Sequence, residues 1–184
     1  DVCSSDLVPI LDQGREGACT GYGLATVAHY LFRTRKYKSD QTQVSPQMFY
    51  DLARRYDEWA GVDYEGSSCR GAMKGWYKHG VCTAAQWQSK SKVPALTEKL
   101  AQEAALRPLG AYFRVNHTDI VAMHAAIAEV GVLYASATVH AGWSEVSADG
   151  YIQPSSDILG GHAFAIVAYD QDGFWVQKDR KSTR

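Results

Sequence analysis

One cysteine lies in a stretch of small and flexible residues, LDQGREGACTGYG, between positions 11 and 23. The apolar sequence after Cys19 follows a helical pattern, which places this thiol at the start of a predicted helix. The unpaired N–H groups and partial positive charge of a helix N-terminus favour a thiolate, the nucleophilic form of cysteine. Gly17 and Ala18 leave room for a substrate backbone. Cys19 is therefore a candidate nucleophile, although an isolated cysteine is more commonly a buried structural residue.

A cysteine nucleophile needs a base, and six histidines compete for that role. Five of them have an ordinary explanation as surface residues or as hydrogen-bonded core residues: His29, His79, His117, His124 and His140. His162 differs because it stands between Gly161 and Ala163, where a tight backbone gives way to the apolar strand pattern AFAIVAY. We expect His162 to face Cys19 and to hold the thiol in its ionised form.

A helix must position Cys19, and a strand must position His162. Apolar spacing, caps and glycines predict four helices: 19 to about 35, 46–56, 69–79 and one that ends at 130. Ser45 is expected to cap the second helix and Gly80 to end the third, while Thr118 or Asp119 caps the fourth. The period then changes, and strands are predicted over 132–139, 161–170 and 173–177. Helices followed by strands indicate the α+β class.

Composition limits the range of functions. A chain of 184 residues with 46% hydrophobic and 21% charged residues is typical of one globular domain. Its formal net charge of -1 gives no support for a nucleic-acid partner or an anionic membrane surface. No apolar run approaches the ~20 residues of a membrane span. The cysteine spacing contains no CxxC motif, so no zinc or other metal site is expected.

The two ends of the chain are related through their coding DNA. One DNA string encodes DVCSSDL in one orientation and DRKSTR in the other, and it resembles a common sequencing adapter. We therefore expect residues 1–7 and 179–184 to be translated adapter on either side of a gene fragment that spans 8–178. Cys3 then drops out, which leaves Cys19, Cys69 and Cys82, and three thiols cannot all pair within one chain.

Separated motifs in this chain resemble the papain-like cysteine peptidases, family C1, in order and spacing. Residues 13–19, QGREGAC, resemble that family's Gln-Gly-x-x-Gly-x-Cys run, GHAFAIVAY resembles its His-Ala-x-x-x-Val-Gly-Tyr strand, and VSPQMFYDLARRY resembles its Leu-Ser-Pro-Gln helix. The resemblance implies a two-lobe α+β fold. A helical lobe over about 8–108 would carry the nucleophile helix, and a β-rich lobe over about 109–178, truncated at its C-terminus, would face it across a substrate cleft.

The same resemblance implies a cysteine-type endopeptidase with a thiolate–imidazolium pair. Cys19 would attack a peptide carbonyl and form an acyl-enzyme, and His162 would take and return the proton. The Gln13 side chain and the Cys19 N–H would form the oxyanion hole. The family's third catalytic residue, an Asn, is expected at the position of Lys178, 16 residues after His162. An Asn codon cut after two bases and completed by the adapter's first base reads as Lys.

Substrate-binding residues follow from the resemblance as well. Gly66 and Ser67 match the family's Gly-Gly segment, which pairs with the substrate backbone, with serine in place of the second glycine. Gly161, Ala163 and Ser136 are expected to line the pocket for the P2 side chain, where their small size leaves room for an apolar or aromatic group. The implied partner is a peptide or protein substrate, and the resemblance implies no cofactor.

Two positions depart from the family pattern and resemble bacterial members more than lysosomal ones. Thr20 stands where the family usually has Trp, and Glu16 stands where many members have a disulfide-bonded Cys. Without that disulfide no oxidising compartment is required, and Cys69 and Cys82 either pair or stay reduced. The location stays open between bacterial cytoplasm and a periplasmic or secreted site.

Two other classes of function remain open from the sequence. One is a catalytically inactive papain-like binding module, which would not need Gln13, Cys19 and His162 together. The other is a Cys–His amidase or acyltransferase with similar geometry. Labelling of Cys19 by a thiol-directed epoxide peptide separates the first from a peptidase, and transfer to an amine separates the second.

Overall fold

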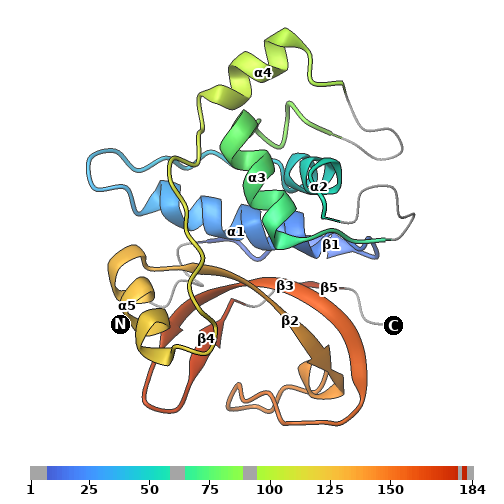
Figure 1. The fold of residues 1–184 in the computed structure, drawn as a ribbon, viewed down its shortest axis with the longest axis vertical. Coiled ribbons are helices and arrows are strands. Elements are labelled where there is room, and N and C mark those ends of the chain that lie inside the picture. Colours follow the sequence, from blue (N-terminus) through green and yellow to red (C-terminus); the bar gives the residue numbers. More distant parts are fainter. Residues whose placement is uncertain (1–7, 59–64, 89–94, 178–179, 182–184) are drawn as a thin grey trace.

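The computed structural model describes residues 8–58, 65–88, 95–177 and 180–181. After the short strand β1 (Asp12–Gly14) come four helices: α1 (Cys19–Arg33), α2 (Pro46–Arg55), α3 (Cys69–His79) and α4 (Glu98–Ala105). A fifth, α5 (Ile120–Val130), precedes the main strands. Figure 1 shows α1–α4 gathered on one side of a curved sheet, with α5 standing beside that sheet. This order of elements confirms the predicted α+β class.

The predicted caps are present at the helix ends. The Ser45 side chain accepts a hydrogen bond from the Met48 N–H at 3.0 Å, and Pro46 occupies the first turn. Asp119, rather than Thr118, caps α5 by accepting from the Ala122 N–H at 2.9 Å. These side chains satisfy N–H groups that have no partner inside the helix.

Two helix predictions need correction. Helix α1 ends at Arg33 instead of about 35, with the Thr34 N–H bonded to the Tyr30 carbonyl. Helix α4, capped by Thr97, was not predicted from the sequence. It is eight residues long and buries only Ala104 fully, so its apolar stripe is too short to give a clear helical period.

The main sheet has the order β2-β3-β4 and is antiparallel throughout. Its strands are β2 (Leu133–His140), β3 (Ile158–Tyr169) and β4 (Phe174–Val176). All three coincide with predicted strands, but β3 begins three residues earlier because its N-terminal part continues to pair with β2. A second, two-stranded parallel sheet joins β1 (Asp12–Gly14) to β5 (Arg180–Lys181), which falls in the segment expected to be adapter.

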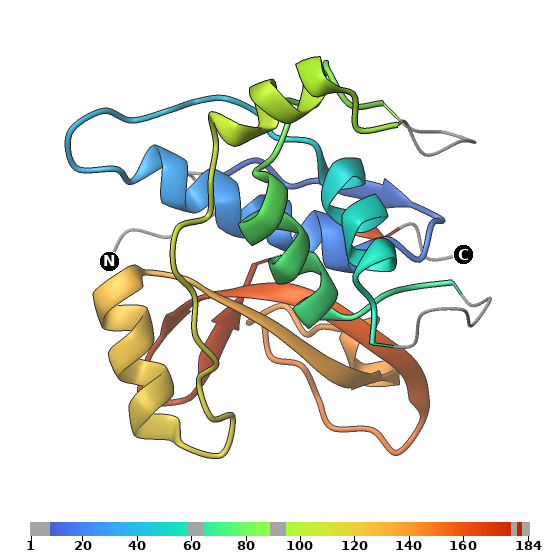
Figure 2. The same ribbon diagram turned by 45° about the horizontal axis from the view of Figure 1, so that its top comes forward.

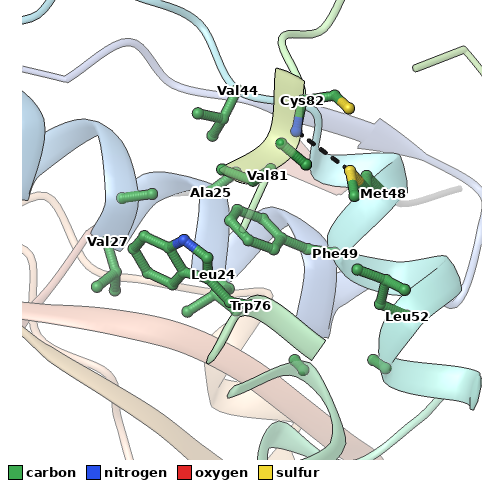
Figure 3. Close-up of a cluster of buried hydrophobic side chains, with 14 of the residues drawn as sticks. Leu24, Ala25, Val27, Val44, Met48, Phe49, Leu52, Trp76, Val81 and Cys82 are labelled. Carbon is green, nitrogen blue, oxygen red and sulfur yellow. Dashed lines mark hydrogen bonds between the residues drawn. The ribbon is translucent and has the colours of Figure 1, made fainter. Parts of the chain in front are cut away.

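Helix α1 lies between α2 and α3 on one side and the sheet on the other (Figure 2). Figure 3 shows the apolar core of the helices, where the buried Trp76 ring packs against Phe49 at a centroid distance of 5.1 Å. A smaller cluster of Ile127, Phe164 and Ile166 joins α5 to the sheet. The core therefore fixes α1, and with it Cys19, on both of its faces.

No helix in the described ranges is both long enough and apolar enough to cross a membrane.

Candidate active site

Cys19 is the first residue of α1 and is half-buried. Ala18 precedes it as N-cap, is fully buried, and offers no side-chain hydrogen bond to the helix. No side chain therefore caps the first turn, in which the Gly21 N–H bonds the Ala18 carbonyl at 2.9 Å. The partial positive charge of the helix N-terminus acts at the position of Cys19. This environment is the one that the sequence predicts for a cysteine nucleophile.

Gln13 lies in β1, which contacts α1, and only 4% of its surface is exposed. Its Nε2 donates one hydrogen bond to the Glu16 carbonyl at 2.9 Å. A side-chain amide carries two N–H donors, so one remains for another acceptor. The buried Oε1 has no partner among the described residues. Gly14, with φ of 62°, turns the chain between Gln13 and the start of α1.

His162 lies on β3, where it is half-buried and directly opposite Ala137 of β2. The next residue, Ala163, packs against α1 so closely that a Cβ on Gly23 would lie 3.0 Å from its carbonyl oxygen. Gly23 is about one helical turn beyond Cys19. The close passage at Gly23 therefore brings the strand that carries His162 to the N-terminal end of α1, where Cys19 is.

The predicted substrate-binding segment also lies at this end of α1. A Cβ on Gly17 would lie 3.3 Å from the Glu65 side chain and 3.4 Å from the Gly66 nitrogen. Gly66 has a φ of 117°, which side-chain-bearing residues rarely adopt, and its N–H bonds the Tyr50 hydroxyl at 3.3 Å. The Ser67 hydroxyl lies 2.6 Å from the hydroxyl of Thr20. Segment 65–67 is thus held beside Cys19 from two sides.

The three predicted pocket residues share one part of the β2–β3 pair. Ser136 lies opposite Ala163, and Gly161 lies opposite Thr138. Ser136 and Gly161 are exposed, whereas Ala163 is 2% exposed. The described structure therefore brings Gln13, Cys19 and segment 65–67 together at one end of α1 and passes β3 next to them. Lys178 lies outside the described residues.

Comparison with known proteins adds an independent finding. Xylellain, a cysteine protease from Xylella fastidiosa, matches with a TM-score of 0.73 at 23% sequence identity, over 91% of this chain and 69% of that one. The bromelain protease from Ananas comosus matches with a TM-score of 0.62 at 15% identity, over 96% of this chain and 80% of that one. The digestive procathepsin L 3 of the Tenebrio molitor larval midgut gives 0.62 at 11% identity, over 94% and 56%.

The chain has the papain-like fold. Identities this low establish the architecture alone, and neither a protein-family model nor a curated protein sequence matches the chain. The fold agrees with the one implied by the motifs around residues 13–19, 44–56 and 161–169.

Three residues of the site were not assigned a role from the sequence. Trp143, at the end of the short 3-10 helix η2 (Ala141–Trp143), lies edge-on to the His162 ring at a centroid distance of 6.2 Å. The Tyr134 hydroxyl donates to the Thr20 carbonyl at 2.7 Å and so ties β2 to the first turn of α1. In the sequence, Thr20 stands out only as a departure from the papain-like pattern. No local pattern marks Trp143 or Tyr134, because their partners lie far away in sequence.

A second thiol, Cys69, stands near the site at the start of α3. Its Sγ donates to the Ala135 carbonyl at 3.8 Å, and burial raises the pKa of this thiol, against interactions with Tyr134 and Ser136 that lower it. Desolvation and the neighbouring Cys69 together hold the pKa of Tyr134 well above its usual value. Both groups are therefore neutral near pH 7, and Cys69 is a poor nucleophile.

Cys69 and Cys82 are both free thiols, so they do not form the disulfide that the sequence left open. Cys82 is fully buried in the helical core, where its Sγ lies 3.4 Å from the Leu100 carbonyl. Within the described ranges, no group of three or more His, Cys, Asp or Glu side chains could hold a metal ion.

The other histidines have structural roles where the contacts are known. His29 is buried and accepts a hydrogen bond from the Val44 N–H at 2.9 Å. His79 Nε2 lies 2.6 Å from the Tyr56 hydroxyl. His124 stacks on Tyr169 at a centroid distance of 4.1 Å. These contacts agree with the ordinary explanations that the sequence offered for them.

Proposed function

We propose that this chain is a cysteine-type endopeptidase that hydrolyses peptide bonds through an acyl-enzyme intermediate. The observation that carries the proposal is the close packing of β3 on Gly23, because it brings the His162 strand to the helix end that bears Cys19. A nucleophile and a base held at one helix N-terminus are what thiol-dependent acyl transfer requires.

In the proposed first step, the Cys19 thiolate attacks the carbonyl carbon of the scissile peptide bond. The carbonyl oxygen becomes an oxyanion, which the Cys19 backbone N–H and the second Nε2 hydrogen of Gln13 would stabilise. The buried position of Gln13 supports this role, since a donor held in place before reaction needs no reorganisation.

His162 then gives its proton to the leaving amine, and the C–N bond breaks to leave a thioester on Cys19. A water molecule attacks the thioester while His162 takes one proton from it. Release of the acid product restores the thiolate and the imidazolium. The edge of Trp143 against the His162 ring supports a fixed ring orientation during both transfers.

The third member of the catalytic group belongs to the same proposal. The Gln177 N–H bonds the Ala165 carbonyl at 2.9 Å, so the chain after β4 still runs antiparallel to the strand that carries His162. An Asn at position 178 would supply a side-chain oxygen for the imidazole N–H, whereas the Lys side chain carries only donors.

The test combines labelling with cleavage. The full chain is treated with a thiol-directed epoxide peptide, the labelled residue is mapped by mass spectrometry, and cleavage of a denatured protein is followed in parallel. Label on Cys19 together with cleavage supports the proposal. Cys82→Ala, which removes a thiol buried away from the site, serves as the control and should keep the label.

Two results would overturn the assignment. Absence of label on Cys19 in the folded protein favours a non-catalytic binding module. Label on Cys19 with transfer of an acyl group to an amine, and no net hydrolysis of peptides, indicates an acyltransferase.

A further inference from the structure

The residue after the candidate nucleophile makes an unusual long-range contact. The Thr20 and Ser67 hydroxyls lie 2.6 Å apart although the residues are 47 positions apart in sequence. Thr20 is 2% exposed and Ser67 is half-buried, so bulk water competes little for this hydrogen bond at the Thr20 end. Both residues are departures from the papain-like motifs, which have Trp and Gly at these positions. Neither family residue carries a hydroxyl, so the two departures are explained by one hydrogen bond.

Thr20 is held from the sheet as well. Its carbonyl accepts a hydrogen bond from the Tyr134 hydroxyl of β2 at 2.7 Å. The backbone of the first turn of α1 is thus fixed to the sheet, while the side chain of the same residue reaches the loop before α3. Cys19 directly precedes Thr20, so any displacement of Thr20 also displaces the nucleophile.

Segment 65–68 has few other attachments near its centre. The Gly66 N–H bonds Tyr50, and the Ser68 side chain is occupied as the cap of α3, where it accepts from the Gly71 N–H at 3.0 Å. Ser67 lies between them, and no bond from its main chain to another described residue is present. Among the described residues, its side-chain bond to Thr20 is therefore what fixes Ser67, and its backbone N–H and carbonyl have no partner there that an extended peptide would have to displace.

We propose that Thr20 and Ser67 form a positioning pair that holds the substrate-binding segment in register with Cys19. This inference rests on the proposed peptidase function. The pair does not touch the reacting atoms: it fixes where the substrate backbone lies relative to the thiol. Without the bond, Ser67 can move relative to Gly66, and part of the substrate-binding energy is then spent on ordering Ser67.

The expected consequence is a change in KM with little change in kcat. Thr20→Val replaces the hydroxyl by a methyl group of similar size, and Ser67→Gly restores the residue of the family pattern. Each should raise KM about fivefold, the effect of losing one hydrogen bond of ordinary net strength. The double variant should be no worse than either single variant, because both remove the same bond. Thr20→Ser keeps the hydroxyl and should keep the KM of the original chain.

Two peptide substrates separate positioning from a general loss of structure. One has two residues before the scissile bond and reaches segment 65–68, and the other has a single residue and does not. The increase in KM should appear with the longer peptide only. Equal effects on both peptides, or additive effects of Thr20→Val and Ser67→Gly, would overturn the inference.

A measurement without substrate keeps the inference independent of the proposed activity. Amide hydrogen exchange in segment 65–68 should be faster in Thr20→Val than in the original chain, with exchange in α2 unchanged. If the original chain shows neither label on Cys19 nor cleavage, the peptidase proposal fails, and the exchange result still decides whether the pair holds the segment. Unchanged exchange in Thr20→Val refutes the pair.

Discussion

Protonation of His29 should destabilise the fold at mildly acidic pH. This side chain is 1% exposed, its Nε2 accepts from the Val44 N–H, and its Nδ1 has no partner among the described residues. Burial, with a further contribution from the Arg33 charge, lowers the pKa of His29 from 6.5 to about 4. Protonation would turn Nε2 into a donor that faces another donor, and would place a positive charge in the core.

Proton uptake at His29 in the unfolded chain determines how stability changes with pH. Between pH 6.5 and pH 4 the unfolded chain binds a proton at His29 that the folded chain does not bind, so stability falls as pH falls. The part of the free energy of unfolding that depends on neutral His29 is complete above pH 6.5. It is lost toward pH 4 with a slope of up to about 1.4 kcal/mol per pH unit. From pH 7 to pH 5 the loss is about 2 kcal/mol, which lowers Tm by about 4 to 8 °C for a chain of this size.

Urea unfolding at pH 7 and pH 5, followed by tryptophan fluorescence, measures this loss. In His29→Gln the amide oxygen can still accept from the Val44 N–H but does not titrate, so the pH-dependent loss should shrink by about 2 kcal/mol. His117→Gln, which removes an exposed histidine, is the matched control and should leave the loss unchanged. An NMR titration that places the pKa of the His29 ring near 6.5 in the folded protein would refute the reasoning.

The remaining predictions concern catalysis. Cys19→Ala should abolish peptide cleavage while thermal unfolding stays close to that of the original chain, and retained cleavage by the folded variant would remove Cys19 from its role. Gln13→Ala should lower kcat by about 10²–10³-fold with a smaller change in KM, the usual result of losing one oxyanion-hole donor; an unchanged kcat would assign Gln13 to the turn alone. The pH profile of kcat/KM should be bell-shaped, because Cys19 and His162 titrate as one pair; a single rise with the ordinary thiol pKa of ~8.5 would contradict an ion-paired thiolate. Lys178→Asn should raise kcat/KM, because an amide oxygen can orient the imidazole and an ammonium cannot, and no gain would place the third catalytic residue elsewhere.

Much of the helical half was predictable because its signals are local. The N-caps Ser45 and Asp119 and the terminating glycines Gly80 and Gly131 mark helix ends through contacts within three or four residues. The three strands of the main sheet were also placed, since their apolar runs differ clearly from the helical period. Helix α4 was missed because one buried residue gives no stripe to detect.

The candidate site was likewise predictable only where its signals are local. The positions of Cys19 at a helix start and of His162 at the start of an apolar strand follow from their neighbours in sequence, and the resemblance to papain-like peptidases indicates Gln13 and segment 66–67. None of these local signals indicates how far α1 lies from β3. That depends on the absence of a side chain at Gly23, which lets the Ala163 backbone pass within van der Waals contact of the helix.

The sequence by itself therefore determined the class of the fold, the limits of most elements and the side chains able to do thiol chemistry. Periodicity, capping and turn formation act over a few residues and leave a local pattern. Only the tertiary structure decided that Thr20 bonds Ser67, that Tyr134 holds the first turn of α1, and that Trp143 stands against the ring of His162. These contacts join residues 19 to 114 positions apart in the chain. They form because packing of the core brings their elements together, and that process leaves no local pattern in the sequence.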